Sequence, residues 1–422
     1  MDYDVDVGPV MLSDLYHEYY ETAVEGILRP ITEPPVIPLT NNNLINGKNS
    51  FDCSKTDLPC TPDAPLASFN FTSGKTHRLR LINPSSASTQ KFTIDGHTMT
   101  VIANDFVEVE PYETDQITLA VGQRSDVLVK AIGKPTDAVY MRAVKLCAPS
   151  AGSDEAKAAI YYENADRNLA PTSSPGPNTY NEYCGNDPLE QTVPYYPIAA
   201  GEPAVTEVLP IEFRSNGTHL IWFMANRTFR VNYNDPQLLE AKLGSLNFPF
   251  IENVHNYGSN SSVRFIFENT GNQPHPMHLH GHNIFILAEG SCTNNGTVFE
   301  GKGTSSGNST AEKRGMEGAT MSEYGNCWDG HITNPDNPQR RDVQQLLPGQ
   351  YIVVQWNQDN PGVWPFHCHI AWHLSAGFVW MVLERPEDIM KDMQIPSIVA
   401  QTCRDWSAYT GDHVVPQIDD GL

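Results

Sequence analysis

The sequence predicts an all-β protein made of two β-sandwich domains, at residues 1–195 and 196–422, with a few short helices. Two patterns predict this class. Short runs with alternating apolar and polar residues recur along the chain, as in strands that bury one face. Segments rich in proline, glycine, serine and asparagine separate these runs, and such segments form turns and loops. Because 40% of the residues are hydrophobic, both domains can bury a core.

In the first domain the alternation is clearest over a stretch of about 55 residues that contains several runs. We expect strands at 77–82, 91–94, 98–103, 116–121 and 127–131. A proline- and serine-rich segment follows at 171–177. A second proline-rich segment, at 194–203, is expected to link the domains.

The second domain is expected to begin its strands near Val205, with further strands at 262–268, 284–288, 351–356 and 378–383. Polar residues rich in glycine, asparagine and serine between 290 and 341 predict a long surface loop. Helical patterns are confined to short segments at 386–393 and 397–409.

The formal charge of −23 disfavours nucleic acid and anionic membranes as partners. The sequence has no apolar run of the roughly 18 residues that a membrane helix requires.

The N-terminus has neither the basic nor the apolar region of a signal peptide. Glycosylation sequons nevertheless suggest a secreted protein, so we expect that the chain lacks its natural beginning. The sequons begin at Asn70, Asn216, Asn226, Asn260, Asn295 and Asn308.

The eight cysteines suggest a disulfide framework, although spacing alone does not establish the pairing. Their spacing favours three local bridges, Cys53–Cys60, Cys147–Cys184 and Cys292–Cys327. Cys368 is assigned to a metal because histidines flank it on both sides. Cys403 is then left without a partner.

Two histidine-rich motifs carry the chemistry of the chain. One runs from His367 to His373 in the order His-Cys-His-Ile-Ala-Trp-His, and the other, His-Pro-Met-His-Leu-His-Gly-His, spans 275–282. If 367–369 is a strand, Cys368 faces one side and both adjacent histidines face the other. One tripeptide can then bind metal ions on two sides.

A set of two histidines and one cysteine is typical of a blue-copper electron-transfer site. The candidate ligands are His275, Cys368 and His373, and Phe378 occupies the position of a non-coordinating axial residue. A site without an axial donor favours reduced copper. Zinc is disfavoured because the sequence has no Cys-x₂-Cys pair and no His-Glu-x-x-His motif.

The remaining clustered histidines are expected to form a second metal site. His278 and His280 share a face of a strand, while His275 faces the other way. His367 and His369 oppose Cys368 in the same manner. Electrons could therefore pass singly from the cysteine site to an acceptor that takes several.

Both motifs resemble the two C-terminal signatures of multicopper oxidases, and the surrounding residues resemble an ascomycete laccase. The similar segments include Arg340-Arg341-Asp342, 93–97 and 419–422, and the resemblance covers nearly the whole chain. It implies two cupredoxin-like Greek-key domains. Residues 1–195 would be the second, substrate-side domain of the family, without copper of its own, and 196–422 the third domain.

The resemblance also implies a role for each ligand. The third domain would hold the type 1 copper and half of the ligands of a trinuclear cluster. His278 would bind the type 2 copper, His280 and His367 one type 3 copper, and His369 the other. His373, Cys368, His367 and His369 would form the catalytic electron path.

The sequence departs from the family pattern at three points. No His-x-His motif occurs outside the two clusters, so we expect that the N-terminal cupredoxin domain is missing and that its docking surface is exposed. Cys403 matches a cysteine that pairs with that domain in the family. Ala87 stands where such laccases carry an acidic residue, and Asp420 stands where serine is usual.

The expected function is that of a laccase-like enzyme that oxidises phenols or similar small aromatic reductants and reduces O₂ to water. A complete enzyme would hold four coppers, and this chain one stably bound type 1 copper. Two alternatives stay open: a metal-ion oxidase of the ferroxidase type, and a non-catalytic blue-copper fragment. The resemblance implies a secreted protein.

Overall fold

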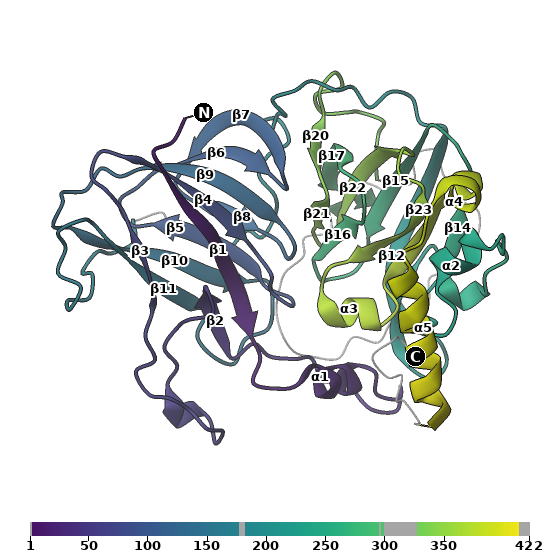
Figure 1. The fold of residues 1–422 in the computed structure, drawn as a ribbon, viewed down its shortest axis with the longest axis horizontal. Coiled ribbons are helices and arrows are strands. Elements are labelled where there is room, and N and C mark those ends of the chain that lie inside the picture. The colour runs from purple at the N-terminus through teal and green to yellow at the C-terminus, as the bar shows by residue number, and fades with distance from the viewer. Residues whose placement is uncertain (1, 177–181, 295–296, 299–326, 413–422) are drawn as a thin grey trace.

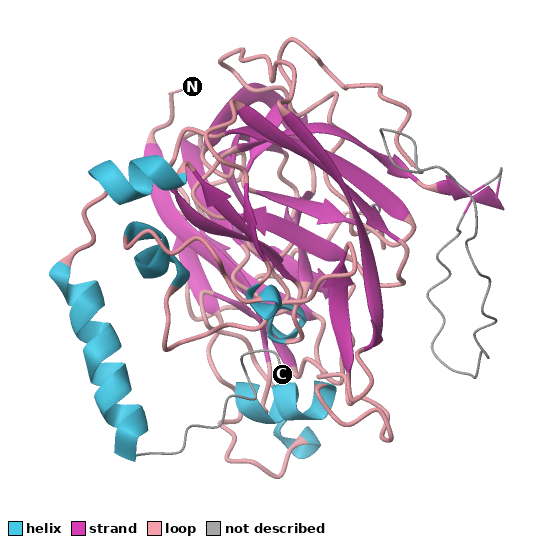
Figure 2. Ribbon diagram, turned by 90° about the vertical axis from the view of Figure 1, so that its right-hand side faces the viewer, coloured by secondary structure: helices cyan, strands magenta, loops and turns pink. Residues whose placement is uncertain are grey.

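The computed structural model describes residues 2–176, 182–294, 297–298 and 327–412. The predicted all-β class is confirmed, because four sheets make up most of the structure (Figure 1). Figure 2 shows the helices at the periphery of these sheets. The tail at 419–422 and the sequons at Asn295 and Asn308 lie outside the described residues.

The N-terminal half contains two sheets, with strand orders β2-β1-β4-β9-β6-β7 and β3-β11-β10-β5-β8. Strand β1 runs parallel to β4, and β4 runs antiparallel to β9. The strands are β1 (Val5–Leu15), β2 (Asn42–Ile45), β3 (Ala67–Asn70), β4 (Thr76–Ile82), β5 (Thr89–Ile94), β6 (Met99–Asn104), β7 (Val107–Thr114), β8 (Ile117–Leu119), β9 (Arg124–Lys130), β10 (Ala138–Leu146) and β11 (Glu155–Tyr161).

Strand β4 shows why the alternating pattern was a good guide in this half. Leu79 and Leu81 are buried in a core that also contains residues of the second sheet, such as Phe92. Arg78 and Arg80 point to the other face, where they pair with acidic side chains of neighbouring strands. The period of two therefore separates a core face from a charged face.

The C-terminal half contains the other two large sheets, with strand orders β13-β12-β15-β22-β17-β20 and β14-β24-β23-β16-β21. Two short strands that follow β17 in the chain, β18 (Thr293–Asn294) and β19 (Thr297–Val298), pair with each other. The other strands are β12 (Val205–Ser215), β13 (Leu220–Met224), β14 (Val254–Asn256), β15 (Ser262–Asn269), β16 (His275–Leu279), β17 (Ile284–Ser291), β20 (Gln339–Arg341), β21 (Val343–Leu346), β22 (Gln350–Asn357), β23 (Gly362–Cys368) and β24 (Val379–Glu384).

The expectation of a surface loop up to residue 341 is wrong at its C-terminal end. Strand β20 pairs with β17, and its residues Gln339, Arg340 and Arg341 are buried. The polar composition concealed this strand, because Arg340 is buried through hydrogen bonds to backbone carbonyls and Arg341 through an ion pair rather than through apolar contacts.

Five α-helices surround the sheets among the described residues, together with two 3₁₀ turns at Cys53–Lys55 and Phe250–Glu252. None of these helices combines the length and the apolar character needed to cross a membrane. The helices are α1 (Tyr20–Ile27), α2 (Gln237–Lys242), α3 (Ala371–Ser375), α4 (Pro386–Asp392) and α5 (Ser397–Asp412).

Helix α1 comes from the N-terminal half but lies below α3 of the C-terminal half (Figure 1). Its buried side chains Val24 and Ile27, together with Ala87 and Leu189, join the core of the C-terminal half. The two halves thus share a core, and the domain boundary between residues 195 and 196 stays a prediction.

The three predicted disulfides, Cys53–Cys60, Cys147–Cys184 and Cys292–Cys327, are confirmed. Cys368 and Cys403 are free, and Cys368 is buried. The sequon residues within the described chain are all exposed, at Asn70, Asn216, Asn226 and Asn260.

A buried ion pair joins the two halves beside the histidine motifs. Asp105, in the turn after β6, receives a hydrogen bond from Nε of Arg341 at 2.7 Å, and both side chains are almost fully buried. Burial alone would raise the pKa of Asp105, but the charges of Arg341 and Arg124 outweigh it and hold the pKa below its usual value. The pair therefore stabilises the fold above the carboxyl's unfolded pKa, and that stability is lost as the pH falls through the folded pKa.

Replacing Asp105 by asparagine is expected to lower the free energy of unfolding by about 3–5 kcal/mol at neutral pH, because Arg341 is left buried without its charge partner. Asparagine tolerates the left-handed backbone conformation of this position, where φ is +46°. Urea unfolding measures the change. The matched control, Asp6→Asn at the half-exposed Asp6–Arg80 pair, should cost about 0–1 kcal/mol. Equal losses in the two variants would contradict this account.

Candidate metal centres

Strands β16 and β23 pair antiparallel and bring the two histidine motifs together. Met277 lies opposite Cys368, and His278 lies opposite His367. Directly opposed residues of an antiparallel pair project from the same face of the sheet, and the next pair projects from the other. His278 and His367 therefore share one face, while Cys368 shares the opposite face with Met277 and His275.

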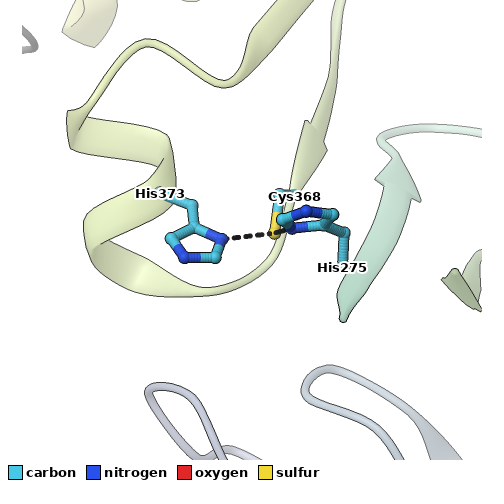
Figure 3. Close-up of side chains that lie close together, drawn as sticks. All are labelled: His275, Cys368 and His373. Atoms are coloured by element: carbon cyan, nitrogen blue, oxygen red, sulfur yellow. Dashed lines mark hydrogen bonds between the residues drawn. The ribbon is translucent and has the colours of Figure 1, made fainter. Parts of the chain in front are cut away.

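His373 reaches Cys368 from helix α3, which begins just after β23 (Figure 3). The helix is held by backbone hydrogen bonds at both ends. The N–H of His373 donates to the carbonyl of Ile370 at 3.0 Å, and the N–H of Phe378 donates to the carbonyl of His373 at 3.0 Å. The N–H of Cys368 in turn donates to the carbonyl of Phe378 at 3.3 Å. The segment from Cys368 to Phe378 is thus closed into a compact loop.

The three donor atoms of this group converge in the interior. The Nδ1 atoms of His275 and His373 lie 3.6 Å and 3.4 Å from the sulfur of Cys368 (Figure 3). His275 and Cys368 are fully buried, whereas 5% of His373 is exposed. His373 therefore offers this site its only contact with the surface among the three residues.

Aromatic rings surround the site. The ring centroid of Trp222, from β13, lies 4.7 Å from those of both His275 and His373. Phe378 stacks on Trp222 at 5.1 Å and meets His275 edge-on at 4.8 Å. Phe378 is fully buried, and its side chain has no atom that can coordinate a metal. The shell excludes water and lowers the local dielectric.

Burial sets the protonation state of these residues. It lowers the pKa of His373 to about 3. Burial, together with the nearby His373, places the pKa of His275 well below its usual value. Burial raises the pKa of the Cys368 thiol well above its ordinary range. Near neutral pH the metal-free site therefore holds two neutral imidazoles and a protonated thiol.

The other face of the strands carries the second histidine group. The ring nitrogens of His278, His280 and His367 lie within 4.8 Å of one another. The Nε2 atoms of His280 and His367 are 3.0 Å apart. The ring of His369 lies 5.7 Å from His278 and 5.6 Å from His367, measured between centroids. His280 is exposed, so this group opens to the surface.

Backbone carbonyls orient two of these rings. Nδ1 of His278 lies 2.7 Å from the carbonyl oxygen of Asp342, and Nδ1 of His367 lies 2.9 Å from that of Cys368. A carbonyl only accepts hydrogen bonds, so each Nδ1 carries the proton and each Nε2 presents its lone pair. Burial lowers the pKa of His367 to about 3.

Both donor sets fit copper. Metal–sulfur bonds of about 2.3 Å and metal–nitrogen bonds of about 2.0 Å, at trigonal or tetrahedral angles, place sulfur and nitrogen about 3.5–3.8 Å apart. The separations of 3.6 Å and 3.4 Å at Cys368 are close to this range. Thiolate is a soft ligand, and imidazole suits copper as well as zinc. Among the described residues, neither group of donor atoms includes a carboxylate.

Comparison with known families agrees with this chemistry. The family model described as multicopper oxidase matches residues 6–165, and a second model of the same description matches residues 223–388. The chain belongs to the multicopper oxidase family.

Relatives within the family include ascomycete laccases. The chain is 31% identical to Laccase-2 of Botryotinia fuckeliana, covering 100% of this chain and 67% of that protein. It is 32% identical to Oxidoreductase OpS5 of Beauveria bassiana, covering 97% of this chain and 64% of the relative. The chain thus spans about two thirds of the length of these curated relatives.

A solved laccase structure has the same fold. The crystal structure of the laccase from Botrytis aclada matches with a TM-score of 0.81 and 28% identity, over 100% of this chain and 71% of that one. This match confirms the predicted cupredoxin-like sandwich architecture of the multicopper oxidases.

Sequence reasoning missed several residues that shape the two sites. Trp222 lies in an apolar strand with no motif around it, and only the fold places it against His275 and His373. Gly122 and Arg124 belong to the other half of the chain and approach the histidine group through tertiary packing. Nothing in their local sequence marks them as neighbours of a metal site.

Loading the Cys368 site with copper(I) is expected to release one proton near neutral pH, from the thiol, because both imidazoles are already neutral. The affinity should therefore rise about tenfold per pH unit between about pH 6 and 8. Calorimetry in two buffers of different ionisation enthalpy counts the protons. The Cys368→Ser chain serves as control and should lose this proton release. Release of two or more protons from the Cys368 site would contradict neutral imidazoles.

Replacing Phe378 by methionine is expected to lower the reduction potential of copper at the Cys368 site, because a thioether can donate to the metal where phenylalanine cannot. Phe378→Leu is the matched control, since it makes a similar change in volume without a donor atom. A redox titration followed by visible absorption measures both potentials. If methionine and leucine shifted the potential equally, the side chain at 378 would not occupy an axial position.

Proposed function

We propose that this chain is part of a laccase-like copper oxidoreductase, which couples one-electron oxidation of phenols or similar aromatic reductants to four-electron reduction of O₂ to water. One observation carries the proposal. Cys368 belongs to one set of donor atoms, and the residues on either side of it, His367 and His369, lie in the other group. Bound copper would supply one-electron transfer at the first site and O₂ reduction at the second.

His373 is proposed as the point where electrons enter. It is the one residue of its group with any exposed surface, and the next residue, Leu374, is 37% exposed. From His373 the route continues through the sulfur of Cys368 to the adjacent His367 and His369. These four residues are the proposed catalytic path, and the hydrogen-bonded loop from Cys368 to Phe378 keeps their spacing constant.

The ligand assignments are proposals of the same kind. His275, Cys368 and His373 would hold the type 1 copper, with Phe378 at the axial position. His278 would hold the type 2 copper, His280 and His367 one type 3 copper, and His369 the other.

We propose that this chain by itself holds one copper firmly, at Cys368, out of the four of a complete enzyme. The three donor atoms at Cys368 are buried and already converge. The histidine group, in contrast, opens to the surface at the exposed His280. The expectation of a docking surface for a further cupredoxin domain stays a prediction.

A metal-ion oxidase of the ferroxidase type is the second candidate, because no carboxylate occupies the position of Ala87. Ala87 is buried, and its N–H donates to the carboxylate of Asp14 at 3.0 Å. The loop therefore presents a methyl group where a phenol oxidase would use an acidic side chain to accept the phenol proton.

An extracellular location is proposed for either enzyme, and the three disulfides support it.

Copper loading combined with a comparison of reductants tests the proposal. We expect one firmly bound copper per chain with intense thiolate-to-copper absorption, which a methoxyphenol should bleach faster than ferrous iron does. Faster bleaching by ferrous iron would favour the metal-ion oxidase. Absence of the thiolate band would contradict both enzymes.

Oxygen uptake in the same samples separates an enzyme from an electron-transfer protein. Bleaching without oxygen uptake would mean that the chain alone acts as a non-catalytic blue-copper protein. Sustained uptake would mean that the four clustered histidines suffice for O₂ reduction.

A further inference from the structure

The turn between β8 and β9 of the N-terminal half lies against the histidine group of the C-terminal half. Gly122 in this turn has a φ of +84°. A Cβ atom at Gly122 would lie 2.7 Å from Cδ2 and 2.9 Å from Nε2 of His369. These distances are shorter than the contacts that Cβ atoms make with non-bonded neighbours, so the bare backbone of Gly122 forms one wall of the position that the His369 ring occupies.

Arg124 connects this turn to the partner of a second histidine. Its Nη1 donates to the carbonyl of Gly122 at 2.9 Å and to Oδ1 of Asp342 at 2.6 Å, and its Nη2 donates to Oδ2 of Asp342 at 2.7 Å. The carbonyl of the same Asp342 accepts the hydrogen bond from Nδ1 of His278. One planar guanidinium thus ties the wall behind His369 to the acceptor that orients His278.

The buried side chain of Gln123 makes a second connection between this turn and the segment around Asp342. Its Nε2 donates to the carbonyl of Val343, next to Asp342, at 3.0 Å. Its Oε1 accepts from the N–H of Ala120 at 2.8 Å. The side chain is buried, so these hydrogen bonds are sheltered from water. The side chains of both Gln123 and Arg124 therefore join the turn to the segment around Asp342.

We propose that Gly122, Gln123 and Arg124 form a positioning turn, through which the N-terminal sandwich sets the rings of His369 and His278 for metal binding. This inference rests on the proposed function of the histidine group as a copper site. The three residues touch the ligands and their hydrogen-bond partners rather than the metal, so they are positioning residues. Partners of this kind typically change metal affinity about 10–100-fold when they are removed.

Gly122→Ala tests the wall directly, and Gly74→Ala is its matched control. Gly74 has a φ of +74° with nothing within 4 Å of its would-be Cβ, so both variants carry a similar backbone penalty. Only Gly122→Ala displaces a histidine ring. A role in folding alone would therefore affect the two variants alike.

The measurements are copper(II) affinity and the electron paramagnetic resonance spectrum of copper on the histidine group, with the thermal unfolding midpoint of the metal-free chain. Gly122→Ala should weaken copper(II) binding at the histidine group at least about tenfold and alter the spectrum. The thiolate absorption at Cys368 should be unchanged. Gly74→Ala should lower the unfolding midpoint comparably and leave copper binding within about twofold of wild type.

Arg124→Lys provides a second test that does not depend on the glycine and carries the decision if Gly122→Ala does not fold. Lysine keeps the charge but cannot bridge Gly122 and both carboxylate oxygens of Asp342. It should weaken copper(II) binding at the histidine group about 10–100-fold. Wild-type affinity in either folded variant would overturn the positioning role. Complete failure of the wild-type histidine group to bind copper(II), even at copper concentrations well above those that fill the Cys368 site, would overturn the proposed role of that group instead.

Discussion

Both candidate metal centres depend on one backbone pairing, that of β16 with β23. Its register sets Cys368 opposite Met277 and His367 opposite His278. A slip of one residue would exchange the faces of every side chain in the pair. Leu279 and Phe366 oppose each other on the face of Cys368 and are fully buried in the core. Their burial stabilises the register, because a slip would turn both toward the histidine side. The core therefore determines which residues can share a metal.

A buried amide just after β4 connects two turns of the N-terminal sandwich that contact the candidate centres. Nδ2 of Asn83 donates to the carbonyls of Ser88 and Leu119, and its backbone bonds with Gly122 and Gln123. The turn at 84–88 contacts α3, where the carbonyl of Ser86 accepts from the N–H of Ala371. The turn at 120–124 contacts His369. Asn83 thus couples the position of the helix that carries His373 to that of the histidine group.

The alternation of apolar and polar residues and the order of the histidine motifs predicted much of this structure, but they carried no information about contacts between residues far apart in the sequence. Alternation located β4, and the order His-Cys-His anticipated that Cys368 and its neighbours face opposite sides. Strand β1 was missed because Gly8 and Pro9 interrupt its alternation, and the pairing with β4 shifts register between Asp6 and Gly8. Trp222 and Gly122 act through contacts between residues remote in sequence, and no spacing rule describes such contacts.

The central claim is that one sulfur and two imidazole nitrogens bind one copper while the residues beside that sulfur face a separate metal group. Anomalous scattering at the copper edge, from crystals of the copper-loaded chain, tests it most directly. The account predicts a peak enclosed by Sγ of Cys368 and the Nδ1 atoms of His275 and His373. Copper located only at surface side chains, or a peak at Cys368 that neither histidine approaches, would contradict it.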